Sequence, residues 1–248
     1  MDRITTIISA KGGVGKTTVT ANLGLALHQS GRETILVDGD FKNPNLALHL
    51  GILEYSYNFQ DVLERGGNIL EALHIHKTGL RIIPSSLSLK HVEIAIKKFR
   101  ELFQNIKGHI LVDSPPGLGE DVISLMKASD DLIIVTTPEI PAVTDALKSI
   151  EIARNMQKKI RGIIVNRHGR KKYEISAEEI SAISNLPVLG VIPEDENVLK
   201  SVMCKTPVIE FNPYSNASIA IRKIASKITG EKYQKPKFLM LKRLIFRT

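Results

Sequence analysis

Two lysines in the stretch KGGVGKTT, residues 11–18, are the side chains of this sequence best suited to binding phosphate. The stretch follows an apolar run and precedes a segment of helical spacing, which predicts a glycine-rich turn between a strand and a helix. Glycines there let backbone N–H groups approach a phosphate, and the start of the helix adds positive potential. Lys16 is expected to contact the β- and γ-phosphates, and Thr17 to bind Mg²⁺. The predicted phosphate-binding set is Lys11, Gly12, Gly13, Val14, Gly15, Lys16, Thr17 and Thr18.

One position departs from the usual pattern of such a loop. Ala10 stands where a glycine is common, five residues before Gly15. The alternative interpretation, a tight turn without a ligand, is disfavoured because the Gly-Lys-Thr-Thr ending lies in the right context. The second lysine, Lys11, raises a separate question, since a single lysine suffices for the loop's own phosphates. Its simplest alternative role is that of a solvated loop lysine.

Two further apolar runs end in aspartate, in ILVDGD and HILVDSPPG. Asp38 and Asp113 close these runs, and carboxylates at strand ends suit Mg²⁺ held through water. Asp38 is expected beside the phosphate loop if the strand order is the usual one. For Asp38 and Asp40 the alternative is that they cap a helix. SPPG predicts a stiff turn near the γ-phosphate, in which Gly117 offers a backbone N–H.

Together these motifs resemble those of the MinD/ParA family of ATPases, over about residues 1–230. The resemblance implies ATP and Mg²⁺ as cofactors and a P-loop NTPase fold of the SIMIBI type. In that family the extra lysine, here Lys11, crosses a two-fold interface to the partner's phosphates. The family's second aspartate, here Asp40, orients the attacking water, and hydrolysis is slow until a partner stimulates it. The implied roles are catalytic for Lys11, Lys16 and Asp40, magnesium-binding for Thr17, Asp38 and Asp113, and switching for Asp38, Asp40, Asn45 and Gly117.

The adenine contacts are expected at two later strand ends. GIIVNRHG places Asn166 and Arg167 just after a strand, and GVIPEDENV places Pro193 and Glu194 after another. Both ends should meet at the carboxyl edge of the sheet, where ligands bind in such folds. The resemblance implies that Asn166 hydrogen-bonds the base and that the backbone near Pro193 closes over it. Ordinary turn chemistry is the alternative for both.

Apolar runs alternate with segments of helical spacing along the chain. The runs are rich in Ile, Val and Leu, as in strands buried on both faces of a mostly parallel sheet. The pattern predicts a doubly wound α/β fold with helices on both faces. The runs are RITTIIS, ETILVD, LRIIP, HILVD, DLIIVTT, IRGIIVN and PVLGVIP, and helices are expected at 17–30, 90–105, 141–157, 176–184 and 215–229.

Charge and cysteine content limit the classes of function. The formal net charge is +8, and residues 231–248 contribute +5 of it, from six Lys or Arg and one Glu. The remaining 230 residues carry only +3, so a nucleic-acid-binding body is not inferred. Cys204 is the only cysteine, whereas iron–sulfur relatives in the family need paired cysteines in each subunit. No apolar run reaches about 18 residues and the start lacks a basic leader, so a cytoplasmic location is expected.

The last stretch, KPKFLMLKRLIFRT, is short, basic and apolar. Such a segment predicts a helix lying in a membrane interface, as in the MinD branch of the family. The predicted domains are an ATPase domain at 1–230, a flexible linker at 231–237 and a membrane-targeting helix at 238–248. Packing on the protein's own core, or a basic arm for nucleic acid, are the alternatives. The residues expected at the membrane are Phe238, Leu241, Lys242, Arg243, Leu244 and Ile245.

The leading hypothesis is an ATP-dependent homodimer that cycles on and off the cytoplasmic face of an anionic membrane and positions the division site or another structure. Its expected partners are itself, the membrane and an unidentified activator or cargo protein. Nucleic acid is not expected. A ParA-like partition ATPase that binds nonspecific DNA and a flagellar-number MinD-like ATPase remain open. A small-molecule P-loop kinase or ligase is the alternative from another class, and it would not need Lys11.

Overall fold

The computed structural model describes residues 3–65, 67–87, 99–103, 106–169 and 171–234 of the 248-residue chain. Within these ranges, eight strands form one sheet in the order β3-β4-β2-β5-β1-β6-β7-β8. Every neighbouring pair is parallel except β3 with β4. The predicted doubly wound fold is confirmed. The strands are β1 Ile4–Ile8, β2 Thr34–Asp38, β3 His74–Ile75, β4 Arg81–Ile83, β5 His109–Asp113, β6 Asp131–Thr136, β7 Lys159–His168 and β8 Val188–Pro193.

Seven of these strands coincide with the predicted apolar runs. All residues of β1, β2 and β6 are buried, which explains why their sequences lack the alternation of a half-exposed strand. The strand that the sequence did not reveal is β3, a two-residue antiparallel edge strand in which Ile75 is exposed. Two residues are too few to show a period.

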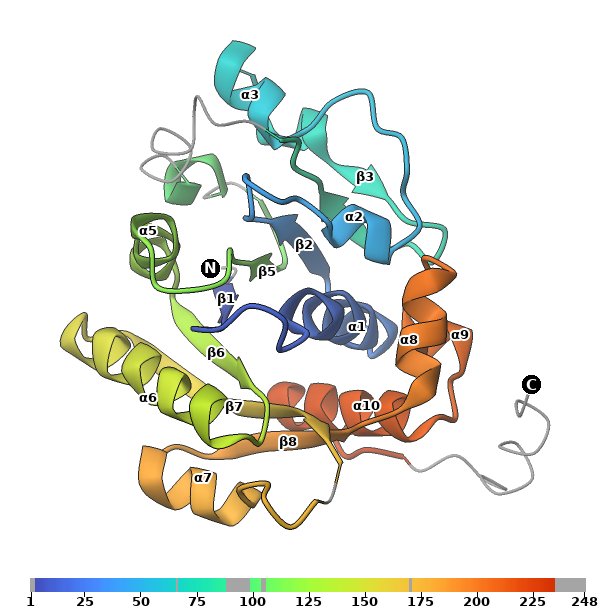
Figure 1. Ribbon diagram of the computed structural model, residues 1–248. Helices are drawn as coiled ribbons and strands as arrows, with labels where there is room; N and C mark the ends of the chain where they lie inside the picture. Colours follow the sequence, from blue (N-terminus) through green and yellow to red (C-terminus); the bar gives the residue numbers. More distant parts are fainter. Residues whose placement is uncertain (1–2, 66, 88–98, 104–105, 170, 235–248) are drawn as a thin grey trace.

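Helices cover both faces of the sheet (Figure 1). The predicted segments 17–30, 141–157, 176–184 and 215–229 correspond to α1, α6, α7 and α10 within two residues. Of the predicted helix 90–105, residues 99–103 are helical, and residues 90–98 and 104–105 lie outside the described ranges. The helices are α1 Lys16–Gln29, α2 Leu46–His49, α3 Phe59–Arg65, α5 Glu120–Ala128, α6 Ile140–Asn155, α7 Ala177–Ser184, α8 Glu196–Met203, α9 Val208–Phe211 and α10 Asn216–Thr229, with a short 3₁₀ turn η1 at Ile69–Ala72.

The core is divided by the sheet. On one face, α1 and α10 pack side chains such as Leu25 and Ile221 against Leu36 and Leu111 of the central strands. The other face holds two clusters, one with α5 and the aromatic side chains near α3, the other with α6 and α7. Burying each such Leu or Ile contributes about 1.5–3 kcal/mol. This two-sided core holds the strand ends, and the loops that follow them, in fixed positions.

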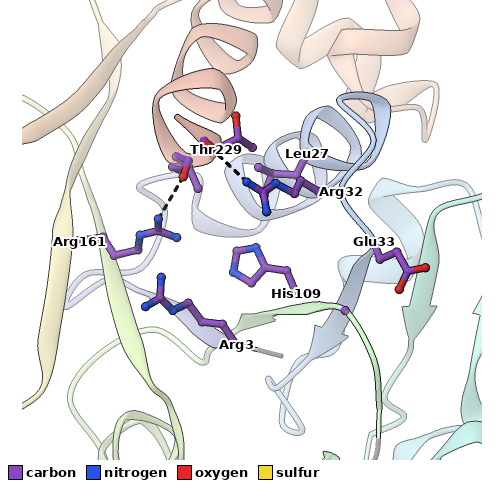
Figure 2. A pocket seen from close by; sticks show the side chains of 9 residues that line it. Arg3, Leu27, Arg32, Glu33, His109, Arg161 and Thr229 are labelled. Carbon is purple, nitrogen blue, oxygen red and sulfur yellow. Dashed lines mark hydrogen bonds between the residues drawn. The ribbon is translucent and has the colours of Figure 1, made fainter. Parts of the chain in front are cut away.

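Each edge of the sheet carries a cavity of its own. A cavity of about 320 Å³ lies at the carboxyl edge, lined by the glycine-rich loop and by Asp40, Asn45 and His49. Another, of about 470 Å³, lies at the amino edge and is bounded by arginines and His109 (Figure 2). The sheet separates the two, so they are independent sites.

The predicted C-terminal segments can be compared with the structure only in part. Residues 231–234 line a cavity beside α10, and the Tyr233 ring lies 5.9 Å from the Lys223 ammonium. The predicted membrane helix 238–248, with Phe238, Leu241, Lys242, Arg243, Leu244 and Ile245, lies outside the described residues. In the described part of the chain, every helix is too short or too polar to cross a bilayer.

Candidate functional site

The glycine-rich loop joins β1 to α1 and turns twice through the left-handed region. Gly13 has φ +81° and Gly15 has φ +83°, a conformation that side chains rarely adopt. A Cβ at Gly15 would lie 2.4 Å from Asn166 Nδ2, so this glycine is also required for space. A Cβ at Gly13 would meet no heavy atom of the described residues within 4 Å, so the loop is open to a ligand there. The predicted strand–loop–helix context of the loop is therefore present.

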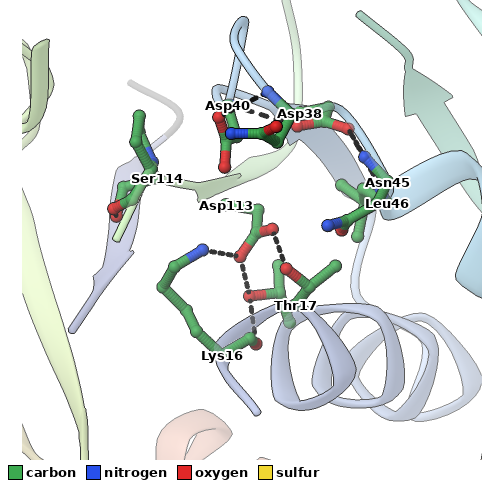
Figure 3. Close-up of polar contacts among 11 residues, drawn as sticks. Lys16, Thr17, Asp38, Asp40, Asn45, Leu46, Asp113 and Ser114 are labelled. Atoms are coloured by element: carbon green, nitrogen blue, oxygen red, sulfur yellow. Dashed lines mark hydrogen bonds and ion pairs between the residues drawn. The ribbon is translucent and has the colours of Figure 1, made fainter. Parts of the chain in front are cut away.

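Lys16 is turned inward at the start of α1, where it pairs with Asp113 (Figure 3). Its ammonium lies 2.7 Å from Asp113 Oδ1, and its side chain is only 6% exposed. Thr17 Oγ1 donates to Asp113 Oδ2 at 2.6 Å, and Thr20 Oγ1 donates to Asp113 Oδ1 at 2.9 Å. One carboxylate at the end of β5 thus gathers Lys16 and Thr17, which the sequence assigned to phosphate and magnesium, together with the hydroxyl of Thr20.

Asp38 is the second buried carboxylate of the site, and backbone amides hold it in place. Its Oδ2 accepts from the N–H groups of Asn45 and Leu46, and its Oδ1 accepts from Asp40, at 3.0–3.1 Å. Burial, and next the charge of Asp113, raise the pKa of Asp38 to about 8. A cation bound between the two carboxylates would relieve the repulsion that raises this pKa.

The strand order places the two carboxylates differently from the prediction. Asp38 was expected beside the phosphate loop, but β5 lies between β1 and β2, so Asp113 is the nearer residue. Asp38 and Asp113 are register partners on adjacent strands. The sequence shows which runs are strands but not their spatial order, because the crossover helices allow more than one.

Asp40 and Lys11 both line the cavity. Asp40 is buried, its Oδ1 accepts from the Asn43 N–H at 3.0 Å, and burial is the main reason that its pKa is raised. Lys11 is exposed at the mouth, in contrast to the buried Lys16. The predicted switch residue Asn45 precedes α2 and lines the same cavity. Gly117, assigned to the γ-phosphate, donates its N–H to the Ser9 carbonyl at 2.9 Å in this structure, so that N–H is engaged within the chain.

The residues predicted to contact adenine fall into two groups. Asn166 Nδ2 donates to the Val14 carbonyl at 2.8 Å, and Arg167 reaches the Gly13 carbonyl at 3.4 Å. Both residues therefore support the glycine-rich loop from β7. Glu194 pairs with Arg167 at 3.3 Å. Pro193 and Glu194 line a different cavity, between β8 and α10, and contact with a base remains a prediction for all four.

Two residues of the site were not singled out from the sequence. His49 lies four residues after Asn45, one turn along α2, and lines the cavity; burial lowers its pKa. Thr20 lies three residues after Thr17 on α1 and binds the same carboxylate. In both cases the sequence offered one signal: a position three or four residues after a predicted site residue, which lies on the same face of a helix.

The donor set fits a magnesium–nucleotide complex. The residues are hydroxyl and carboxylate oxygens, the ligands that Mg²⁺ prefers, next to a lysine and a loop of backbone N–H groups. Among the described residues, no three His, Cys, Asp or Glu side chains form a cage for a metal. That agrees with Mg²⁺ in nucleotide sites, which takes one or two carboxylates and completes its shell with phosphate and water.

Comparison with known proteins gives the family. Residues 1–229 match ParA, described as NUBPL iron-transfer P-loop NTPase. The chain belongs to the ParA family of P-loop NTPases. It is 36% identical over 232 residues to the uncharacterized ATP-binding protein MJ0547 of Methanocaldococcus jannaschii, a match that covers 92% of this chain and 88% of that protein. The predicted family is confirmed.

Two solved members of the family share the fold closely. The cell division ATPase MinD of Pyrococcus furiosus superposes with a TM-score of 0.86 at 34% identity, over 93% of this chain and 99% of that one. The septum site-determining protein MinD of Pyrococcus horikoshii OT3, solved with Mg-ADP, gives 0.85 at 33% identity, over 92% and 96%. The iron transfer in the family description is a property of NUBPL.

Proposed function

We propose that this protein is an ATPase of the MinD type, which binds Mg·ATP in the carboxyl-edge cavity and dimerises face to face while the triphosphate is intact. The observation that carries the proposal is the different placement of the two lysines. Lys16 is buried against Asp113, whereas Lys11 is exposed at the mouth of the same cavity. Lys16 serves the nucleotide of its own subunit, and Lys11 is free to reach that of a facing subunit.

Charge explains why dimerisation would depend on nucleotide. Two facing loops bring together about eight negative charges of bound phosphates, and a cation from each subunit offsets that repulsion. Without the partner's γ-phosphate, Lys11 has less negative charge to meet. The Mg-ADP complex of the Pyrococcus horikoshii protein supports ATP and Mg²⁺ as the ligands.

The chain's own groups have separable tasks in hydrolysis. Gly13, Gly15 and Lys16 would hold the phosphates, while Thr17, Asp38 and Asp113 would hold Mg²⁺. Bound Mg²⁺ supplies Lewis-acid stabilisation of the charge that develops on the phosphate oxygens. Asp40, fixed by the Asn43 N–H, would orient the attacking water. Because catalysis of this kind relies on positioning and charge stabilisation, we expect slow basal hydrolysis, and by the family resemblance a partner protein that stimulates it.

The test of this proposal is the oligomeric state of Lys11→Ala. Size-exclusion chromatography with light scattering, with Mg²⁺ and a slowly hydrolysed ATP analogue, should show a dimer for the wild type and a monomer for the variant. Lys148→Ala, which removes an exposed lysine of α6, is the matched control and should dimerise. A K11A protein that still dimerises on adding the analogue would favour a small-molecule kinase or ligase instead.

The C-terminal segment would convert dimerisation into membrane attachment. Each cation near an anionic leaflet contributes about 1 kcal/mol, and each apolar side chain fully removed from water adds at most about 1.5–3 kcal/mol. Ordering the segment costs about 1–2 kcal/mol per residue, so the terms nearly cancel and one copy holds weakly. Two copies on a dimer gain roughly 10²–10⁴ in avidity. The protein would then be peripheral on the cytoplasmic face of the membrane, positioning the division site or another structure together with an activator or cargo protein.

Deletion of residues 236–248 tests this second step. ATP-dependent sedimentation with liposomes of anionic phosphatidylglycerol should be lost, while ATPase activity and dimerisation remain. Persistent liposome binding by the truncated chain would refute the role of the segment without affecting the ATPase proposal.

A further inference from the structure

The amino edge of the sheet gathers basic residues from separate strands. Arg32 precedes β2, His109 begins β5, Arg3 precedes β1, and Arg161 lies near the start of β7. Because β2, β5, β1, β6 and β7 are consecutive neighbours in the sheet, these residues form a row, although they are up to 158 positions apart. Asp131, at the start of β6, is the acidic member of the row.

The basic side chains converge on one cavity. Figure 2 shows the guanidinium groups of Arg3, Arg32 and Arg161 around the imidazole of His109, whereas the carboxylate of Glu33 points away. The cavity they bound measures about 470 Å³, within the range of small-molecule sites. Convergence of three guanidinium groups on a shared space is unfavourable unless anionic groups offset it.

Part of that offset comes from the end of α10. Arg161 Nη2 donates to the Ile228 carbonyl at 3.1 Å, and Arg32 Nη2 donates to the Thr229 carbonyl at 3.2 Å. Carbonyls in the last turn of a helix have no partner within the helix, so they accept these bonds readily. A guanidinium carries five N–H donors, and the hydrogen bonds found among the described residues use one in each of these two arginines. The arginines are thus fixed in orientation and keep donors for another acceptor.

The acidic residues nearby do not balance the charge. Asp131 is fully buried; its Oδ2 lies 3.2 Å from Arg3 Nε and 3.8 Å from Arg161 Nε. Glu33 also lines the cavity, but its side chain is mostly exposed, its carboxylate points away from His109 (Figure 2), and it lies 3.8 Å from Arg81. One buried carboxylate therefore faces three arginines, and the cavity keeps an excess of positive charge.

The environment of this cavity lowers the pKa of His109. Thr5 Oγ1 donates to Asp131 Oδ1, so it accepts from His109 Nε2 at 2.8 Å, and this contact requires a proton on Nε2. Burial, and then the charges of Arg161, Arg3 and Arg32, lower the pKa of His109 to about 4. The polarity of the cavity suits an anion that accepts several N–H bonds at once. Phosphate is such an anion, because its oxygens match the planar fork of a guanidinium and accept two parallel hydrogen bonds from it.

We propose that the amino-edge cavity bounded by Arg3, Arg32, Arg161 and His109 binds a phosphate group, either free or carried by an ester such as a lipid headgroup. The site lies at the end of α10, next to Gly230, after which the predicted linker 231–237 leads to the predicted membrane segment 238–248. A lipid headgroup bound here would add to the attachment of that segment. The inference stands on the arginine cluster alone and does not depend on the ATPase proposal.

The first arm of the test is calorimetric titration of the full chain with inorganic phosphate, after Mg·ADP has saturated the carboxyl-edge cavity. The wild type should bind with saturation, and Arg32→Gln/Arg161→Gln should bind about tenfold or more weakly, because charge-assisted hydrogen bonds are lost. Arg81→Gln is the matched control, since it removes an arginine at the same edge but outside the cavity. In the wild type, phosphate should also raise the pKa of His109, followed by NMR of its imidazole and assigned with His109→Gln.

The second arm uses vesicles of phosphatidylglycerol and of phosphatidylcholine. If the double variant binds the anionic vesicles more weakly than R81Q does, the lipid headgroup is the source of the phosphate. If the double variant loses phosphate binding but binds the vesicles as before, the ligand is a free phosphate or a soluble ester. If the double variant does not fold, Arg3→Gln replaces it, because that side chain is 46% exposed. The proposal is overturned if the wild type shows neither saturable phosphate binding nor a vesicle difference, or if R81Q loses as much as the double variant. The proposal is also overturned if the wild type binds duplex DNA and the double variant does not, while the wild type shows no phosphate binding.

Discussion

At the carboxyl edge of the sheet, Asp38 and Asp113 end neighbouring strands and are almost fully buried, whereas at the amino edge Arg3 and Arg32 remain largely exposed around an open cavity. The acids are held by groups of the chain itself, namely Lys16, two hydroxyls and three backbone amides around the pair.

Helix polarity accounts for the difference. In a parallel sheet with crossover helices, helices begin at the carboxyl edge and end at the amino edge. The start of α1 presents partial positive charge near the carboxylates, and the last turn of α10 presents carbonyls to the arginines. The comparison teaches that one fold can offer anion-binding groups at both edges, through backbone amides and a lysine at one and through arginines at the other.

The largest effect should come from Lys16→Ala. Removing the buried ammonium should lower ATP affinity and turnover by about 10²-fold or more, because it eliminates the cation closest to the expected phosphates. Fluorescent-nucleotide titration and phosphate-release assays measure this loss. The amino-edge variant Arg161→Gln should keep nucleotide binding; equal losses in both would show that the two edges are not independent.

Next in size is the loss of stability on replacing a buried aspartate of the carboxyl edge, compared with one of the amino edge. Asp113→Asn should lower the free energy of unfolding by about 3 kcal/mol, since it leaves a buried lysine without its carboxylate. Asp131→Asn should cost less, about 1–2 kcal/mol, because the partly exposed Arg3 can turn to solvent. Urea unfolding at neutral pH measures both, and similar losses would contradict the distinction between the edges.

The loss of folding stability at acid pH that comes from His109 should be smaller. Its pKa is about 4 when folded and 6.5 when unfolded, so the unfolded state binds more protons between these values. Stability from this group is complete above pH 6.5 and is lost as the pH falls toward 4. Between pH 7.5 and pH 5, the wild type should lose about 2 kcal/mol more than His109→Gln in urea unfolding. Parallel losses would mean that folding does not lower the pKa of His109.

The smallest expected effect separates two glycines of the same loop. Gly13→Ala and Gly15→Ala both strain a positive φ, but only the second places a methyl against Asn166. G15A should therefore be less stable than G13A by about 1–2 kcal/mol. The double variant Gly15→Ala/Asn166→Ala should recover most of that difference, as thermal unfolding can show. If the double variant does not recover it, contact with Asn166 is not the cause of the extra destabilisation in G15A.

The sequence by itself determined the phosphate loop, seven of the eight described strands and the three aspartates of the carboxyl edge. These are local signals: glycines at fixed spacing before Gly-Lys-Thr-Thr, and continuous apolar runs that end in Asp38 or Asp113. Each depends on neighbouring residues only, so no knowledge of the fold was needed.

Only the tertiary structure decided which strand lies beside which, and with it every contact between distant residues. The order β2-β5-β1 places Asp113, not Asp38, next to the loop, and the order β5-β1-β6-β7 brings His109 and Arg161 to one cavity. No local pattern marks those residues, because single charges at strand starts look like ordinary solvated side chains. They form a cavity together only because packing brings together segments more than fifty residues apart, and that packing depends on the whole core.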